Sequence, residues 1–273
     1  MTKASKVWFI TGTSKGFGRV WAEAALARGD RVVATARDTH ALAALMEQFG
    51  EQILPLQLDV RDREAVFQTV TVAHAHFGRL DVVVNNAGYG LFGMVEEVSE
   101  QQARDQFETN FFGALWVTQA ALPLLRAQRS GHIVQISTIG GVTAFPLFGI
   151  YNASKWALEG MSQALAAEVR DLGIKVTLIE PTAFATAWAR GSAIQAVPNS
   201  AYDGVRQKVL GMWSGQTPGK PEASAAALLE LVDAEDPPLR AFFGDLLEMM
   251  QAEYAQRLAE WKQWQPQARA ASG

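Results

Sequence analysis

Short apolar runs alternate with longer amphipathic segments along most of the chain. Parallel strands that are buried on both faces read as continuous apolar runs, often rich in Val and Ile. Runs of this kind predict strands at residues 7–11, 31–36, 53–58, 80–84, 132–136 and 175–179. A further short run at 239–244 predicts an edge strand.

The segments between these strands carry apolar residues every three or four positions, and several of them end in Gly. This pattern is typical of amphipathic helices with a glycine stop, and it predicts helices at 18–29, 62–78, 152–173, 222–234 and 245–264. Alternation of strand and helix requires parallel pairing with right-handed crossovers. We therefore expect an α/β fold, with a single doubly wound, Rossmann-like parallel sheet, helices on both faces and one domain over residues 1–265.

The alternation weakens after residue 181. Residues 182–220 contain no clear strand pattern and are interrupted by several Gly and Pro residues. A long segment of this kind inside a compact domain is usually a functional loop, so we expect a substrate loop or lid there. Residues 266–273 are expected to form a frayed tail.

Composition narrows the classes of function. The formal net charge of the 273 residues is −4 and no Lys/Arg run occurs, which argues against nucleic acid as a partner. The absence of Cys excludes disulfides and thiolate catalysis, and the four His lack the spacing of a metal site, so no metal is expected. The sequence has no signal peptide and no apolar stretch of about 20 residues. We expect a soluble, cytoplasmic protein without a membrane span.

A glycine-rich loop follows the first predicted strand and opens the next helix. Its sequence, TGTSKGFG, contains Gly12, Gly16 and Gly18. Glycine permits a tight turn and lets the backbone approach a pyrophosphate, whose charge then faces amide N–H groups at the positive end of the helix dipole. The loop therefore predicts a dinucleotide site. The alternative is a glycine turn in an α/β protein that binds no nucleotide.

Tyr151 and Lys155 lie four residues apart in a predicted helix, within the segment IYNASK. This spacing places both side chains on one helix face, with the ammonium close to the phenol. Such a pair is compatible with acid–base chemistry. The alternative is a Tyr with its ring in the core and a Lys that reaches out to water.

Several motifs occur in a fixed order along the first two thirds of the chain. The spacing GxxxGxG at 12–18 is followed by NNAG at 85–88, Asn110 in TNFFG, IST at 136–138 and YNASK at 151–155. Over roughly residues 5–190 these motifs resemble the short-chain dehydrogenase/reductase family, in particular its NADP-preferring branch. The resemblance implies an NADP(H)-dependent oxidoreductase that interconverts a carbonyl and an alcohol.

The resemblance implies four catalytic residues. Tyr151 is the proton donor when a carbonyl is reduced, and Lys155 lowers its pKa and holds the nicotinamide ribose. Asn110 completes a water-linked proton relay to that lysine. Thr138 occupies the position of the family's serine and keeps a hydroxyl that bonds the substrate oxygen. Neighbouring Ser137 is expected on the opposite face of its strand.

The resemblance also implies the residues that hold the cofactor, which are Gly12, Ser14, Lys15, Gly16, Phe17, Gly18, Arg37, Asp59, Val60, Asn86, Ala87, Gly88, Tyr151, Lys155, Pro181 and Thr186. At the end of the second strand an acid is typical of NAD and a base of NADP. Ala36 followed by Arg37, with Lys15 in the glycine loop, therefore favours NADP(H). Asp38 favours NAD if the strand ends one residue later. Thr182 replaces a glycine usual in the family, which makes the backbone there less permissive.

We expect a lipophilic or aromatic ketone, aldehyde or secondary alcohol as substrate, because the segments that the family fold brings around the nicotinamide are apolar. They supply Tyr89, Leu91, Met94, Phe145, Leu147, Phe148, Phe184, Trp188 and Trp213. The alternative is that several of these aromatics only pin the loop to the core.

Two other functions stay open: a catalytically idle NADP(H)-binding regulator, and an isomerase or dehydratase with bound cofactor. The family resemblance suggests a homodimer or homotetramer.

Overall fold

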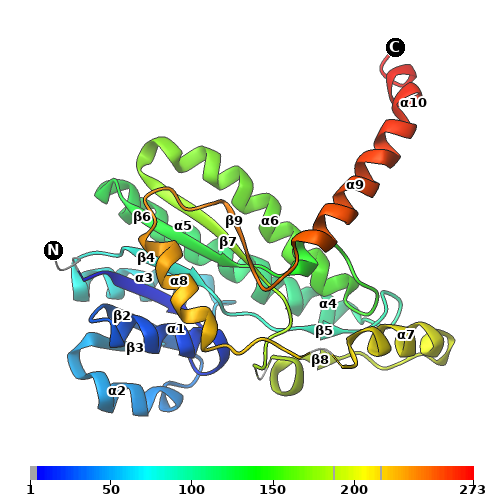
Figure 1. Cartoon of the computed structure of the whole chain (residues 1–273). Coiled ribbons are helices and arrows are strands. Elements are labelled where there is room, and N and C mark those ends of the chain that lie inside the picture. Colours follow the sequence, from blue (N-terminus) through cyan, green and yellow to red (C-terminus); the bar gives the residue numbers. More distant parts are fainter. Residues whose placement is uncertain (1–4, 187, 216) are drawn as a thin grey trace.

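A seven-stranded parallel sheet forms the centre of the molecule (Figure 1). The computed structural model describes residues 5–186, 188–215 and 217–273. Its strands are β1 (Val7–Thr11), β2 (Arg31–Ala36), β3 (Ile53–Gln57), β4 (Val82–Asn85), β6 (Gly131–Ile136), β7 (Ile174–Pro181) and β9 (Arg240–Phe243). They lie in the order β3-β2-β1-β4-β6-β7-β9, and each pair of neighbours is parallel. The predicted doubly wound α/β fold is confirmed.

Helices cover both faces of this sheet. One face carries α1 (Gly16–Ala27), α2 (Ala43–Phe49) and α8 (Ala223–Asp233), and the other carries α3 (Arg63–Phe77), α5 (Gly113–Gln128) and α6 (Gly149–Val169). Successive side chains of a strand point to opposite faces. In β1, Trp8 and Ile10 pack into the first core, while Val7 and Phe9 pack into the second. Burial on both faces explains why the strands read as unbroken apolar runs.

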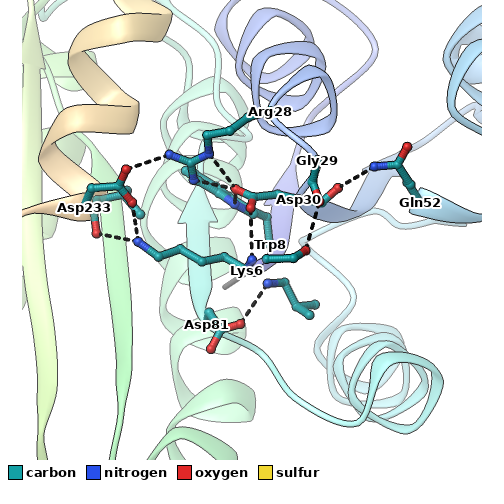
Figure 2. Close-up of polar contacts among 11 residues, drawn as sticks. Lys6, Trp8, Arg28, Gly29, Asp30, Gln52, Asp81 and Asp233 are labelled. Carbon is teal, nitrogen blue, oxygen red and sulfur yellow. Dashed lines mark hydrogen bonds and ion pairs between the residues drawn. The ribbon is translucent and has the colours of Figure 1, made fainter. Parts of the chain in front are cut away.

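An ion-pair network holds the amino ends of the strands together (Figure 2). Asp30, just before β2, accepts hydrogen bonds from Trp8 Nε1 at 2.8 Å and from the Lys6 backbone N–H at 3.0 Å. The Arg28 guanidinium donates to Asp30 and also, at 2.9 Å, to Asp233 at the end of α8. The Lys6 ammonium pairs with Asp233 as well. Two cations and two carboxylates thereby join β1, α1 and α8.

The two edges of the sheet are β9 and β3, and the first confirms the edge strand expected at 239–244. In β3, Pro55 has no backbone N–H. The Leu58 N–H donates to the Ala36 carbonyl of β2 at 2.9 Å. Because an extended backbone repeats every two residues, residue 55 directs its nitrogen to the outer side. Pro55 therefore removes a donor from the exposed edge without weakening the pairing with β2.

Residues 182–220 contain more regular structure than their sequence pattern indicates. β8 (Ile194–Gln195) pairs in parallel with β5 (Leu91–Phe92), and α7 spans Asp203–Trp213. The expectation of a segment without a strand is wrong, because a two-residue strand is too short to show alternation. α7 was not predicted from the sequence because it contains Gly204 and Gly211, and glycine is a poor helix former. Short turns at Trp188–Ser192 and Ser200–Tyr202 complete the described part of this segment.

The last two helices lie outside the sheet. α9 (Leu247–Gln263) projects away from the body of the molecule, and α10 (Gln265–Ala270) follows it (Figure 1). A frayed tail over 266–273 is therefore wrong up to residue 270, because Pro266 lies in the first turn of α10, where its missing N–H breaks no helical hydrogen bond. None of the helices in the described ranges is long and apolar enough to span a membrane. The remaining elements are α4 (Glu100–Phe107) and turns at Thr39–Leu42, Gly50–Gln52, Glu108–Phe112, Ile139–Gly141 and Arg170–Leu172.

Candidate functional site

The loops that follow β1 and β4 lie together at the carboxyl edge of the sheet. These two strands are neighbours, whereas the chain continues from β1 to β2 on one side and from β4 to β6 on the other. Such a reversal of direction leaves a crevice at the carboxyl ends of the strands, where ligands bind in open parallel sheets. Residues 12–15 and 86–90 therefore flank the expected site.

Asn86 and Ala87 hold the glycine loop in place. The Thr11 hydroxyl accepts hydrogen bonds from the backbone N–H groups of Asn86 and Ala87, both at 2.9 Å. The Asn86 side-chain amide donates to the carbonyl oxygens of Thr11 at 2.8 Å and Gly12 at 3.0 Å. The side chain of Asn86 is thus committed to the backbone of the loop and fixes its shape.

The glycines of this loop have conformations and neighbours that exclude other residues. Gly12 and Gly16 have φ of +71° and +60°, the left-handed region that favours glycine. A Cβ on Gly18 would lie 2.4 Å from the Gly12 carbonyl oxygen. Among the described residues no side chain caps the N-terminus of α1, so its first N–H groups stay available to an anion. These residues fit the pyrophosphate of a dinucleotide.

The side chains of the same loop divide between the surface and the core. Ser14 and Lys15 are exposed, and Lys15 Nζ donates to the Gly191 carbonyl at 3.4 Å. Phe17 is half-buried and stacks on Trp21 with ring centroids 4.8 Å apart, against the core beneath α1. Phe17 therefore offers a ligand its backbone and not its ring.

The end of β2 presents a cation and no free acid. Ala36 is the last residue of the strand and is buried, and Arg37 after it is exposed. The Asp38 carboxylate accepts a hydrogen bond from the His40 backbone N–H at 2.9 Å and caps the turn at Thr39–Leu42. The carboxylate of Asp38 is therefore used for local structure.

Asp59 and Val60 lie in the loop after β3. The Asp59 carboxylate pairs with the Arg61 guanidinium at 2.6 Å, and hydrogen bonding from Arg61 lowers the pKa of Asp59. Val60 is buried against Gly113, where a Cβ would lie 2.6 Å from Val60 Cγ2. Asp59 stays ionised as a result, and Arg61 restrains its position.

Asn110 lies in a π turn, Glu108–Phe112, between α4 and α5. Its Oδ1 accepts a hydrogen bond from the Tyr89 N–H at 3.1 Å, and its Nδ2 donates to the Tyr89 carbonyl at 3.0 Å and to Ser154 Oγ at 3.3 Å. A Cβ on Gly88 would lie 3.1 Å from Asn110 Oδ1 and 3.6 Å from Lys155 Nζ. Asn110 and Lys155 therefore face the same small space. The sequence gives no signal for the π turn or for the contact with Ser154.

Lys155 is buried, with 6 % of its surface exposed, and does not reach water as the alternative reading requires. Its Nζ donates to the Ile136 carbonyl at 2.7 Å. Burial lowers the pKa of Lys155 to about 8, and the negative charge of Glu159 opposes this shift. The ammonium is therefore held at the end of β6. Its pKa of about 8 lies close to neutral pH, so a small further shift changes its protonation.

Tyr151 lies one turn earlier on α6 and is also buried. The Trp188 ring lies 5.2 Å and the Phe148 ring 6.3 Å from its ring centroid. Burial raises the pKa of Tyr151, and hydrogen bonding with the Thr138 side chain opposes the rise. The sequence predicts a pKa lowered by Lys155. In this structure the shift is upward, because the phenol is desolvated and the ammonium donates to Ile136.

The hydroxyl groups of Thr138 and Ser137, at the end of β6, have different neighbours. The Thr138 side chain interacts with the Tyr151 phenol by hydrogen bonding, which lowers the pKa of that phenol. Its Oγ1 also accepts a hydrogen bond from the Gly140 N–H at 3.3 Å. Ser137 Oγ lies near Glu159, since a Cβ on Gly141 would be 2.5 Å from that oxygen and 3.2 Å from Glu159 Cγ. Of the two hydroxyls, Thr138 is the one beside the phenol.

Comparison with known proteins assigns this arrangement to a family. The family model described as short chain dehydrogenase matches residues 6–195. This chain belongs to the short-chain dehydrogenase/reductase family. The assignment made from the motifs is confirmed, and the chain is an oxidoreductase of this family.

Relatives of this short-chain dehydrogenase/reductase align along almost its whole length. Oxidoreductase BOA17 of Botryotinia fuckeliana is 42 % identical over 262 residues, covering 94 % of this chain and 93 % of the relative. The 3-ketodihydrosphingosine reductase of Bacteroides thetaiotaomicron is 34 % identical, covering 96 % and 93 %. The solved structure of a short-chain dehydrogenase from Streptomyces avermitilis has a TM-score of 0.91 and 40 % identity, covering 99 % and 100 %. Other solved structures with this fold are complexes with NAD or with NADP.

The segment that begins at the end of β7 places Thr186 beside the glycine loop. Pro181 ends β7, and a Cβ on Gly16 would lie 3.7 Å from Thr186 Cβ. Among the described residues other than glycine, positive φ occurs only at Arg129 and Leu147. Thr182 therefore adopts an ordinary backbone, and its N–H donates to the Phe243 carbonyl at 3.0 Å. Replacement of the family's glycine at 182 causes no strain there.

An apolar cluster surrounds Tyr151. It contains most of the predicted substrate-facing residues, namely Leu91, Met94, Phe145, Leu147, Phe148, Trp188 and Trp213, together with Phe92, Tyr202 and Val209, which the sequence did not indicate. Phe184 packs instead against Phe17 at the margin of the first core, with ring centroids 4.9 Å apart, and Tyr89 lies outside this cluster. A groove of about 440 Å³ opens beside the cluster, lined in part by Met94, Phe145 and Val205.

No metal-binding group of His, Asp or Glu occurs in the ranges that the structure describes.

Proposed function

We propose that this short-chain dehydrogenase/reductase uses NADP(H) to interconvert a carbonyl and an alcohol on a lipophilic or aromatic substrate. The observation that carries the proposal is the convergence of four side chains at the carboxyl edge of the sheet. Tyr151 lies beside Thr138, and Lys155 and Asn110 face one space next to Gly88. A binding protein without chemistry has no need of this constellation.

The chain's own residues carry the proton in the proposed reaction. During reduction, Tyr151 donates its phenolic proton to the substrate oxygen, which the Thr138 hydroxyl holds in place by hydrogen bonding. The Lys155 ammonium stabilises the phenolate that is left and passes a proton back toward it. Asn110, fixed by Tyr89 and Ser154, positions the next member of this relay. The dinucleotide, when bound, supplies or accepts the hydride.

A preference for NADP(H) is supported by the charges around the end of β2. Arg37 is exposed there, Lys15 lies in the glycine loop, and Asp38 is engaged in capping its own turn. A ribose 2′-phosphate is best held by cations, whereas an unmodified ribose needs a free acid. In the part of the chain that the structure describes, neither Arg37 nor Lys15 forms an ion pair that would have to break, and Lys15 Nζ donates a hydrogen bond to the Gly191 carbonyl.

A lipophilic or aromatic substrate is supported by the apolar cluster around Tyr151. Trp188 packs on Tyr151 and Phe92, and Trp213 packs on Phe148 at 4.8 Å between ring centroids. Apolar walls with few polar groups select for apolar ligands. The relative from Bacteroides is named for the reduction of a keto compound, 3-ketodihydrosphingosine, which is consistent with this class of substrate.

The test is NADPH oxidation with a panel of carbonyl compounds that runs from small polar to bulky apolar. We expect turnover that rises with apolar size and falls by about 100-fold or more in the Tyr151→Phe variant. NADPH binding, followed by the change in its fluorescence, should persist in that variant. Tight NADPH binding without turnover of any compound in the panel would instead favour the idle regulator.

We also propose that the protein is a homodimer or homotetramer. Light scattering on the purified protein would measure its oligomeric state.

A further inference from the structure

Two buried carboxyl groups face each other directly beneath the site. Glu159 lies on α6, one turn after Lys155, and Glu180 lies near the carboxyl end of β7. Their exposed fractions are 5 % and 1 %. Arg240 of β9 contacts both, with Nε 2.9 Å from Glu159 Oε2 and 3.5 Å from Glu180 Oε1.

Arg240 is the one ion-pair partner of the two carboxyl groups among the described residues, because Lys155 Nζ donates to the Ile136 carbonyl. The ion pairs therefore do not balance if both carboxyl groups are ionised. Within the described part of the chain, no N–H or O–H group meets the geometry of a hydrogen bond to Glu159 Oε1 or to either carboxyl oxygen of Glu180. The groups nearest to these oxygens are Arg240, the Ser137 hydroxyl and the other carboxyl group of the pair. A buried carboxylate without partners is strongly unfavourable, and two adjacent carboxyl groups relieve this by sharing one proton. In agreement, burial and the charge of Glu159 raise the pKa of Glu180 to about 8.

Few other groups face the pair. α6 contributes Lys155 and the amide of Gln163, which accepts from Arg240 Nη2 at 2.9 Å. The end of β6 contributes Ser137, and the turn at Ile139–Gly141 contributes Gly141, which has no side chain. Lys155 and Arg240 are thus the cations near the pair among the described residues. The charge of Glu159 already supports the ammonium of Lys155.

We propose that the pair Glu159 and Glu180 holds one shared proton at neutral pH, releases it to solvent in mildly alkaline solution, and by its charge keeps Lys155 protonated. Glu159 and Glu180 are then positioning residues, because they act through Lys155. This role for the pair rests on the proposed function, in which the Lys155 ammonium supports Tyr151. The second negative charge appears over the pH range in which Lys155 would otherwise lose its proton. Activity is thereby sustained toward alkaline pH.

The shared proton is tested without any activity, by thermal unfolding of the whole protein between pH 5 and pH 8. An unfolded glutamate ionises above about pH 4.5, whereas the folded pair keeps its proton until about pH 8. The wild type therefore loses stability over this range. Glu180→Gln removes the effect, so its Tm relative to wild type should rise by roughly 5 °C or more from pH 5 to pH 8. Glu159→Gln should behave in the same way.

The matched control is Glu168→Gln, which removes an exposed glutamate from the same helix. Its Tm difference from wild type should not change with pH. A constant Tm difference for both Glu180→Gln and Glu159→Gln would mean that the pair is fully ionised at neutral pH. That result would overturn the proposal.

The link to Lys155 is tested by the pH profile of kcat/KM for carbonyl reduction. Glu159→Gln should move the alkaline limb of the profile to lower pH by about half a unit to one unit, because Lys155 loses a neighbouring negative charge. Glu159→Asp should restore part of the shift, and Glu168→Gln should cause none. A uniform loss of kcat with an unmoved limb would refute the link. If the wild type reduces no carbonyl, the proposed function fails, while the unfolding series still decides whether the proton is shared.

Discussion

Two clusters of charged side chains, each built around buried carboxyl groups, lie at opposite ends of the same sheet and are built differently. At the amino ends, Lys6 and Arg28 face Asp30 and Asp233, so that cations and carboxylates are equal in number (Figure 2). At the carboxyl ends, Arg240 is the one cation that forms ion pairs with Glu159 and Glu180 among the described residues, and Lys155 lies one helical turn from Glu159 without such a pair. The first cluster is balanced and the second is not.

This difference has a physical meaning. A balanced network with its hydrogen bonds satisfied has no reason to exchange a proton near neutral pH, so its role is structural, and removal of one partner destabilises the fold. An unbalanced cluster shifts the pKa of its members into the working range. Lys155, next to the unbalanced cluster, also has a pKa shifted to about 8. We infer that stability and chemistry are separated along the strand direction, and substitutions at either end test this separation.

The largest expected effect is the loss of turnover in Tyr151→Phe. The substitution removes only the hydroxyl that transfers the proton, so we expect carbonyl reduction to fall by about 100-fold to 10,000-fold. Steady-state assays with the best substrate of the panel measure this loss. Tm should change little, since the ring contacts with Trp188 and Phe148 persist. Tyr254→Phe on the exposed face of α9 is the control, and equal losses in both variants would remove Tyr151 from the chemistry.

The next effect belongs to the opposite end of the sheet and should be purely structural. Asp30→Ala leaves Trp8 Nε1 and the Lys6 N–H without their acceptor and Arg28 with one partner fewer. We expect a loss of about 2 to 4 kcal/mol in the free energy of unfolding, measured by urea denaturation. At temperatures well below Tm, kcat/KM should match wild type. Asp171→Ala, at an exposed position, should change neither quantity.

A smaller effect is expected at Arg37, on the rim of the site. If Arg37 holds the 2′-phosphate, Arg37→Ala removes a charge-assisted contact and lowers kcat/KM for NADPH by roughly 10-fold to 150-fold. The value for NADH should hardly change, because that cofactor lacks the phosphate. Parallel kinetics with the two cofactors measure the ratio. Equal efficiencies of NADPH and NADH in the wild type would exclude the proposed preference.

The smallest effect is expected for Thr138→Ser. The hydroxyl beside Tyr151 is retained, and only a methyl group is lost. A buried methyl contributes about 0.8 kcal/mol at most, so kcat/KM should stay within about fourfold of wild type. Thr138→Ala removes the hydroxyl as well and should reduce kcat/KM much further. If Ser and Ala variants were equally impaired, the methyl group and not the hydroxyl would be what the site needs.

The sheet was predictable because its signal is local. Each buried strand is an apolar run, and the alternation with helices leaves one topology class. The turn of the glycine loop and the position of Tyr151 one helical turn before Lys155 were predictable for the same reason, since both follow from the spacing of residues close together in the sequence.

The rest depends on contacts between distant segments. Nothing near Glu159 or Glu180 in the sequence indicates that they meet, because α6 and β7 bring them together only in the folded sheet. The π turn around Asn110 leaves no pattern either, since it shifts the helix by one residue without a special composition. Phe184 was assigned to the substrate side, yet it packs on Phe17, because hydrophobicity alone does not tell an aromatic in a wall from one in the core.

Pro55 on the outer side of β3 also has a consequence for colloidal behaviour. An exposed strand edge is a template on which other chains add strands, and a missing donor in the middle of a five-residue strand interrupts that template. Growth of aggregates from this edge is therefore disfavoured even when the protein is crowded. Replacing Pro55 by Val would restore the donor and should raise the rate of aggregation, seen by light scattering, while the pairing of β3 with β2 stays intact.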